Sequence, residues 1–207
     1  ESVFYYITLC NENYAMPPMP EGARDGILKG LYLAKPCAVK GLKHRAQLLG
    51  SGTILNEVVK AQAILAEKYG VAADVWSVTS YKELRREAME CERWNLLHPG
   101  EKPRVPYVTQ TLAPTEGPII ASSDYVKLLP DGLNRWMPRP LYSLGTEGFG
   151  RSETRKALRD FFEVDARYVT LATLTQLAQQ KVIKLDVVTQ AIKDLDINPD
   201  KLNPLIA

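Results

Sequence analysis

The first stretch of the sequence whose residue types could hold a ligand comprises Gly50, Ser51, Gly52 and Thr53. A short apolar run precedes it and an amphipathic helix pattern follows it, and a strand, a glycine turn and a helix together often bind phosphate. The dinucleotide fingerprint G-x-G-x-x-G needs a third glycine, but Leu55 occupies that position. The N–H groups of a helix N-terminus would still attract an anion. The stretch is therefore a candidate anion or nucleotide site, and the alternative is a tight corner between a strand and a helix.

The loop "TEGFGRSETR", residues 146–155, is the second stretch whose residue types could bind a ligand. Its two glycines allow sharp backbone turns, and Phe149 offers an apolar anchor. Arg151 can pair with a carboxylate or another anion, and Ser152 can cap the helix that is predicted to follow. The alternative interpretation is a structural loop between a strand and a helix that helps to form a subunit contact.

The sequence offers little for a metal site or a catalytic nucleophile. Its two histidines are His44 and His98, and a predicted helix end separates His98 from Cys91. Without another soft ligand nearby in the sequence, this pair is interpreted as a packed cysteine and a loop histidine. The tail "DLDINPDKLNP" has the Asp and Asn spacing of a calcium loop, but Pro199 stands where that loop requires glycine. The G-x-S-x-G motif of an α/β-hydrolase is absent from the sequence.

Composition argues against several classes of partner. The 207 residues contain 26 Lys and Arg against 24 Asp and Glu, a net charge of +2 without a block of like charge. We therefore expect neither a nucleic acid nor a membrane as a partner. The sequence shows no apolar run of transmembrane length and no signal peptide. Its three cysteines form no C-x-x-C pair, which indicates a reducing, cytosol-like compartment.

Alternating strand and helix patterns must position these residues. Strands are predicted over residues 2–13, 46–51, 73–80, 117–123 and 139–146. Helices are predicted over residues 53–69, 81–97, 152–164, 165–180 and 184–196, and a short helix or turn over residues 21–34. Ser80 and Glu83 form a capping box at the start of the second helix. The alternation implies an α/β fold with a mostly parallel sheet that helices cover on both faces.

A proline-rich stretch divides the chain near its start. Three prolines in "YAMPPMPEG", residues 14–22, exclude regular structure and predict a stiff connector. We therefore assign residues 1–22 to a leading strand and this connector. Residues 23–207 are predicted to form one folded domain.

Several of these stretches together resemble one enzyme family. They read "VFYYITLCNENYAMPPMPEG", "QLLGSGTIL", "CERWNLLHPGEKPRVPY", "LGTEGFGRSETR" and "FFEVDARYV". From Val3 to Ala207 the chain resembles the C-terminal part of the homodimeric pyruvate dehydrogenase component, a thiamine-diphosphate-dependent enzyme of the transketolase superfamily. The motifs "CERWN" and "GFGRS" at this spacing are specific to that family. Ala15 departs from its pattern, which has a bulkier polar residue such as His there.

The resemblance implies a fold, and it implies that the cofactor-binding motifs lie in other domains. The fold is that of a transketolase C-terminal domain, with three layers, a mostly parallel sheet of about five strands and helices on both faces. In this family a G-D-G…N-N motif of the first domain holds the diphosphate and its magnesium ion, and the middle domain supplies the activating Glu. This sequence contains neither G-D-G nor N-N. We therefore assign it no catalytic, cofactor-binding or metal residue, and expect the chain alone to be inactive and to bind no cofactor.

The resemblance also implies an activity for the full-length enzyme. That enzyme is an oxidoreductase that decarboxylates pyruvate on thiamine diphosphate with Mg²⁺ and reductively acetylates lipoyl groups. The implied partners are the preceding domains, a second subunit of a homodimer and the dihydrolipoyl acetyltransferase core, in the bacterial cytoplasm. The candidate contacts with those domains or with the second subunit are Trp94, His98, Phe149 and Arg151. Two alternatives stay open: an anion- or nucleotide-binding regulatory module, and the same domain of another transketolase-superfamily enzyme.

Overall fold

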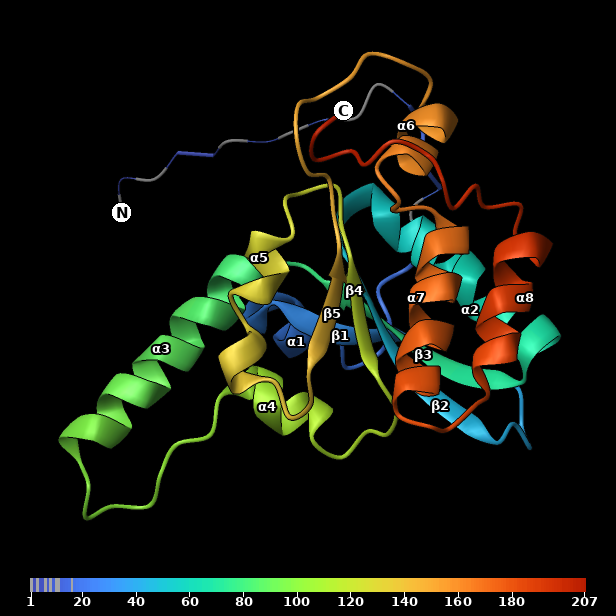
Figure 1. Cartoon of the computed structure of the whole chain (residues 1–207). Coiled ribbons are helices and arrows are strands. Elements are labelled where there is room, and N and C mark those ends of the chain that lie inside the picture. The colour runs from blue at the N-terminus through green and yellow to red at the C-terminus, as the bar shows by residue number, and fades with distance from the viewer. Residues whose placement is uncertain (1, 3, 6, 8, 10–11, 16) are drawn as a thin grey trace.

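The computed structural model describes residues 2, 4–5, 7, 9, 12–15 and 17–207. Five strands form one sheet in the spatial order β1-β3-β2-β4-β5, and Figure 1 shows helices on both of its sides. The strands are β1 (Leu31–Lys35), β2 (His44–Gly50), β3 (Val71–Val78), β4 (Ile119–Ser122) and β5 (Leu141–Leu144). The α-helices are α1 (Arg24–Lys29), α2 (Leu55–Tyr69), α3 (Tyr81–Leu97), α4 (Tyr107–Leu112), α5 (Leu128–Asp131), α6 (Arg155–Phe161), α7 (Ala166–Gln179) and α8 (Leu185–Asp194). Two short 3-10 helices are η1 (Gly52–Ile54) and η2 (Asn134–Trp136).

The sheet is parallel except at one edge. The central strand β2 has β3 and β4 as parallel neighbours, and β5 is parallel to β4. Among the strands of the described residues, only β1 runs antiparallel, against β3. A strand in the middle of a parallel α/β sheet is buried on both faces, which is why residues 46–50 of β2 are all buried. The predicted three-layer α/β fold with a mostly parallel sheet is confirmed.

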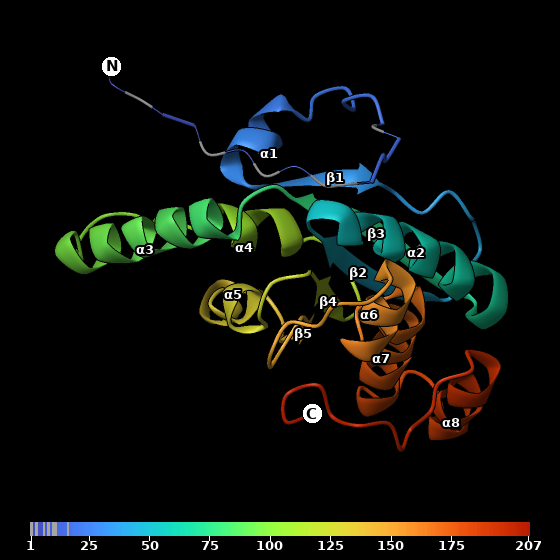
Figure 2. The same ribbon diagram turned by 90° about the horizontal axis from the view of Figure 1, so that it is seen from above.

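Two hydrophobic cores lie on the two faces of the sheet. Consecutive residues of β2 point into different cores, because side chains alternate along a strand: Leu48 joins the first and Leu49 the second. Side chains of α2, α7 and α8 complete the first core, and those of α3 and α4 complete the second. Figure 2 shows the two groups of helices on different sides of the sheet.

Local signals in the sequence define most helix boundaries. The predicted helices over residues 53–69, 81–97, 165–180 and 184–196 correspond to α2, α3, α7 and α8. Ser80 caps α3 as predicted, because its Oγ accepts a hydrogen bond from the N–H of Glu83 at 3.1 Å. In the described part of the chain, no helix combines the length and the apolar character that crossing a membrane requires.

The prediction of one short helix or turn over residues 21–34 is wrong in its second half. The helix α1 ends at Gly30, which has a left-handed φ of +102° and lies against α3. A Cβ at Gly30 would lie only 2.5 Å from the carbonyl oxygen of Ser80. The chain then forms β1, whose first residue Leu31 is fully buried and pairs with Val78. This long-range pairing outweighs the weak local helix propensity.

The leading strand predicted over residues 2–13 lies partly outside the described residues. Its described members, such as Phe4 and Ile7, belong to neither a helix nor a strand and are exposed. The strand and the domain boundary at residue 22 therefore stay predictions.

The helix α4 lies just after the proline-rich loop that follows α3, where the sequence predicted no element.

Candidate functional site

The glycine turn is the corner between β2 and α2. A Cβ added to Gly50 would lie 2.9 Å from Cα of Leu55 and 3.1 Å from Cγ2 of Val58. Real Cβ atoms do not approach a backbone atom this closely, so the glycine lets the helix pack directly on the strand. Gly52 has a φ of +54°, in the left-handed region that favours glycine. Both glycines therefore have a geometric role in the corner.

The surroundings of this corner do not suit an anion. Asp124 Oδ1 lies 3.8 Å from the position that a Cβ on Gly52 would occupy. This carboxylate lies close to the turn and would repel a phosphate there. Ser51 is buried, and its N–H donates to the carbonyl oxygen of Ser122 at 3.4 Å. These contacts favour a packing corner, and the anion site stays a prediction.

The residues of this domain do not fit the diphosphate and magnesium ion that the family resemblance implies for a whole enzyme. Within the described residues, no group of three or more His, Cys, Asp or Glu side chains is placed to hold a metal ion. A magnesium-bound diphosphate requires carboxylate or carbonyl oxygens on the metal and cations or free N–H groups on the phosphates. At the glycine corner, the side chain next to the helix start is the Asp124 carboxylate. We therefore assign no catalytic step to this chain.

Trp94 lies on the outer half of α3, which projects from the body of the molecule in Figure 1, and His98 follows the last residue of that helix. We call residues 89–106 the arm. The rings of Trp94 and His98 stack with their centroids 4.4 Å apart and their planes 9° from parallel. The guanidinium of Arg104 lies 4.2 Å from the centre of the Trp94 ring, a cation–π distance. The two candidate residues thus brace the end of α3 against the loop that follows it.

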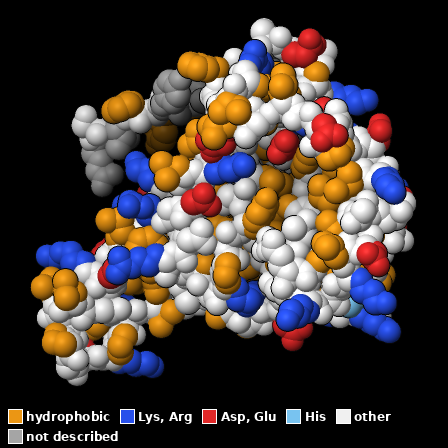
Figure 3. Space-filling view, in the orientation of Figure 1, with side chains coloured by type: hydrophobic (Ala, Val, Ile, Leu, Met, Phe, Trp, Pro, Cys, Tyr) orange, Lys and Arg blue, Asp and Glu red, His pale blue; other side chains and the backbone are white. Residues whose placement is uncertain are grey.

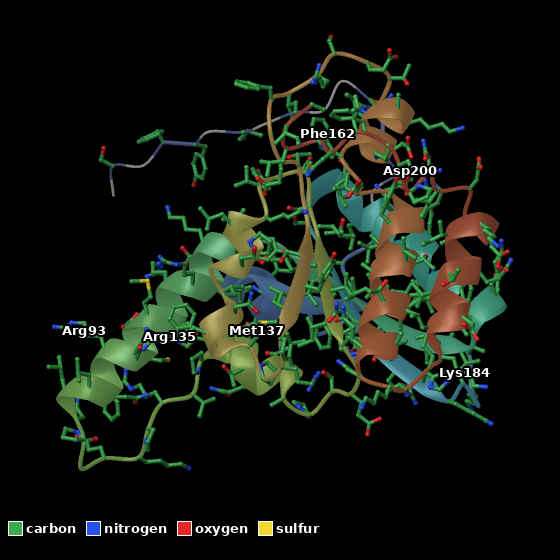
Figure 4. The ribbon with its side chains drawn as sticks, in the orientation of Figure 1. Arg93, Arg135, Met137, Phe162, Lys184 and Asp200 are labelled. Carbon is green, nitrogen blue, oxygen red and sulfur yellow. The ribbon has the colours of Figure 1, made fainter. Side chains whose placement is uncertain are left out.

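Polar contacts hold the arm in the same geometry. The Asn95 amide donates to the carbonyl oxygen of Arg104 at 2.9 Å and accepts from its N–H at 2.7 Å. From η2, Arg135 forms an ion pair with Glu92, and Figure 4 shows the Arg135 side chain against the projecting half of α3. These contacts connect the loop of the arm to its helix and to η2.

The arm carries apolar side chains into solvent. They include Met89, Leu96, Leu97 and Val105, and Leu96 is 77% exposed. Figure 3 shows hydrophobic side chains gathered at the projecting end of the molecule. Exposed leucines on a preorganised framework are typical of a surface that another protein surface covers.

Cys91 lies at the root of the arm and is buried. Its Sγ donates to Glu87 Oε1 at 3.2 Å, whereas Nδ1 of His98 lies 2.8 Å from the carbonyl oxygen of Trp94. Burial, reinforced by the hydrogen bond to Glu87, raises the pKa of the Cys91 thiol to about 11. The thiol is therefore protonated at neutral pH and inert. Cys91 is packed as the sequence predicts, and His98 lies in the loop directly after α3.

Phe149 and Arg151 lie in the loop between β5 and α6, at the opposite end of the molecule from the arm (Figure 1). Phe149 is 84% exposed. Arg151 donates to the carbonyl oxygen of Ala207, and its guanidinium lies 5.4 Å from the centre of the Phe161 ring. The structure therefore brings Arg151 to the C-terminal tail, far in sequence from the loop. It does not unite the four candidate contact residues in one site.

The helix after this loop begins later than the sequence predicts. The N-cap of α6 is Thr154, whose Oγ1 accepts a hydrogen bond from the N–H of Ala157 at 3.4 Å. The predicted cap at Ser152 is wrong, because only the residue directly before the first helical turn can bond its free N–H groups. Gly148 has a φ of +80°, and a Cβ there would lie 2.3 Å from the carbonyl oxygen of Pro204. Glycine is therefore required where the C-terminal tail crosses the loop.

A groove of about 850 Å³ lies between this loop, α6, α7 and the tail. Its apolar floor includes Phe161, Tyr168 and Leu202. Lys201 anchors the tail, because its Nζ donates to the carbonyl oxygen of Phe161 at 3.0 Å and to the Tyr168 hydroxyl at 3.2 Å. The cations along the groove are thus engaged with groups of the domain itself.

Glu57 is the polar residue whose role the sequence did not reveal. The helix pattern assigns it to the polar face of α2, yet its side chain is only 7% exposed. Its carboxylate accepts hydrogen bonds from Arg159 at 3.0 Å, from Lys60 at 2.8 Å and from the N–H of Ala166 at 3.2 Å. Arg159 lies 102 residues away in sequence, so no local pattern could have indicated the pair.

The fold and these sites define a class of protein. Residues 30–165 match the family described as transketolase-like TK C-terminal domain, and the chain belongs to this family. A solved structure with the same fold is transketolase from Leishmania mexicana, with a TM-score of 0.51. It is 17% identical over 75% of this chain and 19% of the transketolase chain, so it supports the fold alone.

Curated relatives specify the class further. The pyruvate dehydrogenase E1 component of Pseudomonas aeruginosa is 52% identical over 99% of this chain, and that of Escherichia coli strain K12 is 51% identical over 100% of this chain. The chain spans 23% of the length of each of these relatives. The resemblance to the pyruvate dehydrogenase component is confirmed, and this chain corresponds to its transketolase-like C-terminal domain.

Proposed function

We propose that this chain is a structural domain of a full-length pyruvate dehydrogenase E1 component whose catalytic and cofactor motifs lie in other domains. That enzyme would decarboxylate pyruvate with bound thiamine diphosphate and Mg²⁺ and reductively acetylate the lipoyl groups of a dihydrolipoyl acetyltransferase core. It would act as a homodimer in the bacterial cytoplasm. The observation that carries the proposal is identity of 52% and 51%, over essentially the entire chain, to two E1 components.

In this proposal the domain contributes contacts, and the cofactor held elsewhere supplies the carbanion chemistry. The arm offers Leu96 and Leu97 on a framework that is already rigid, so little side-chain and loop entropy is lost when it is covered. At the other end, Phe149 offers a second exposed anchor. Large apolar anchors surrounded by polar groups suit a stable interface with the preceding domains or with a second subunit.

The enzymatic part of the proposal is tested with the full-length protein. With thiamine diphosphate, Mg²⁺ and a lipoyl domain, we expect pyruvate-dependent acetylation of the lipoyl group. A version that lacks residues 23–207 is expected to lose both dimerisation and most of this activity. If the full-length protein instead uses a different ketoacid or a sugar phosphate, the domain belongs to another transketolase-superfamily enzyme.

The competing hypothesis of a regulatory anion or nucleotide site is tested on the chain itself. Calorimetric titrations with thiamine diphosphate plus Mg²⁺, with ATP and with NAD are expected to give no heat of binding. Binding of a nucleotide with a micromolar Kd, roughly 8 kcal/mol, would instead assign a ligand to the glycine corner. A Gly52→Asp variant that abolished such binding would locate it there.

A further inference from the structure

Tyr14 joins the connector to the folded domain. Nη2 of Arg159 donates to the Tyr14 hydroxyl at 3.0 Å, and Nη1 of Arg155 lies 3.4 Å from the same oxygen. The hydroxyl in turn donates to Glu12 at 2.8 Å. Arg155 also pairs with Glu12, and its guanidinium lies 5.9 Å from the centre of the Tyr14 ring. Both the ring and the hydroxyl of Tyr14 therefore contact arginines of the folded domain.

A buried carboxylate fixes the arginine that receives Tyr14. The side chains of Arg159 and Glu57 are only 18% and 7% exposed, and their 3.0 Å ion pair is therefore protected from solvent. Glu57 lies in the first turn of α2 and accepts from the first N–H of α7, which are both favourable places for negative charge. We call Glu57, Arg155 and Arg159 the Tyr14 socket. Three helices, α2, α6 and α7, thus meet at the point where the connector docks.

We infer that the Tyr14 socket fixes the direction in which the polypeptide enters this domain and so positions the preceding domain of the longer enzyme. The inference rests on the proposed function, since it takes a preceding domain as the partner. The chain spans 23% of its curated relatives, so the connector would be the covalent link to a much larger body. An orientation fixed at the link limits how that body can sit on the domain.

The prolines of the connector cannot supply this orientation themselves. They stiffen residues 17–20, but a stiff segment still pivots about its attachment point. That point is Gly22, which has a φ of +73° and open space around it. Tyr14 lies on the far side of the prolines from Gly22, so the socket holds the end of the stiff segment that is remote from its attachment point. The connector therefore has a fixed direction relative to the domain.

Limited proteolysis with chymotrypsin tests the socket in the 207-residue chain and in the full-length protein. Chymotrypsin cleaves after Tyr and Phe alike, so Tyr14→Phe removes the hydroxyl without removing the cleavage site. We expect cleavage after residue 14, measured by mass spectrometry, to become about five-fold faster, the change that the loss of one hydrogen bond predicts. Arg159→Gln should give a similar increase, and the double variant should add little to either, because both changes break the same contact.

Two controls separate a docked connector from general destabilisation. Arg86→Gln removes the exposed arginine–carboxylate pair of α3 and should leave cleavage after Tyr14 unchanged. The melting temperature of Tyr14→Phe should equal that of the original chain, because the connector lies outside both hydrophobic cores. Equal cleavage rates for Tyr14→Phe and the original chain would overturn the inference. These cleavage rates do not depend on enzymatic activity. An inactive full-length protein would therefore contradict the proposed function, while the rates would still show whether Tyr14 docks in the socket.

Discussion

The glycine corner and the arm differ in what their sequences suggest and in what their structures offer. The corner has part of a phosphate-binding motif, yet Leu55 packs against Gly50 and Asp124 faces the helix start. The arm contains no ligand-binding motif, yet it presents Leu96 and Leu97 to solvent on a braced framework. Glycines at a turn can thus serve packing alone, whereas exposed apolar side chains on a braced element favour an interaction surface.

The largest expected effect comes from a substitution that disrupts the glycine corner. Gly50→Val would place a side chain against the backbone of Leu55, 2.9 Å away, and the helix would have to move off the strand. We expect the free energy of unfolding to fall by about 3 kcal/mol, the upper part of the range for overpacked cores. Urea denaturation of the chain measures this change.

A matched change at the neighbouring glycine sharpens the result. Gly52→Ala adds a methyl group where the nearest contact is 3.8 Å away, so only the positive φ opposes it. We expect a loss of about 1 kcal/mol. If Gly50→Val unfolds at the same urea concentration as the original chain, the corner is not closely packed and a ligand site there regains support.

Sequence reasoning was reliable where one element carries its own signal. The apolar spacing of α2 and the Ser80 cap of α3 are local, and both helices lie where the patterns predict them. The α/β alternation likewise predicted a mostly parallel sheet, but it did not predict the spatial order of the strands. Family motifs then added the identity of the domain, which spacing alone could not provide.

The features that sequence reasoning missed depend on contacts between distant segments. β1 forms because Leu31 pairs with Val78, and Glu57 is buried because Arg159 reaches it from another helix. The role of Tyr14 depends on that same arginine. Such pairings are decided by the assembled fold, so neither periodicity nor propensity within a short window reveals them.

The second prediction concerns the bracing of the arm. Trp94→Ala removes the stack with His98 and the cation–π contact with Arg104. We expect the chain to lose about 1 kcal/mol of stability, because the contacts are partly exposed. Hydrogen exchange of residues 95–104 should accelerate more than exchange in α2. Equal acceleration in both regions would show that the arm is not an independent unit.

The third prediction uses the buried thiol at the root of the arm. The pKa of Cys91 is raised to about 11, above the unfolded value of about 8.5, so the folded state holds this proton more tightly. Because the folded state binds the Cys91 proton more tightly, this proton contributes fully to stability below about pH 8.5. The contribution is lost as the pH rises toward 11. Urea denaturation between pH 7 and 10.5 should show a steeper decline for the original chain than for Cys91→Ala. Parallel curves would contradict the raised pKa.

The smallest expected effect separates surface from core. Leu96→Ser changes a side chain that is 77% exposed, so the stability of the chain should change by less than about 0.5 kcal/mol. The same measurement on Leu48→Ser, at a fully buried position, should show a loss of about 2–3 kcal/mol. A large loss for Leu96→Ser would mean that the arm packs on this domain and does not serve an outside partner.

The central claim is that the arm is a contact surface of an assembled enzyme, and sedimentation velocity of the full-length protein tests it most directly. The double variant Leu96→Ser with Leu97→Ser is compared with Leu128→Ser, whose side chain is equally exposed but lies on α5. We predict that the arm variant weakens dimer association at least about ten-fold, or 1.4 kcal/mol, and lowers pyruvate-dependent activity, while Leu128→Ser changes neither. Unchanged sedimentation and unchanged activity of the arm variant would contradict the account.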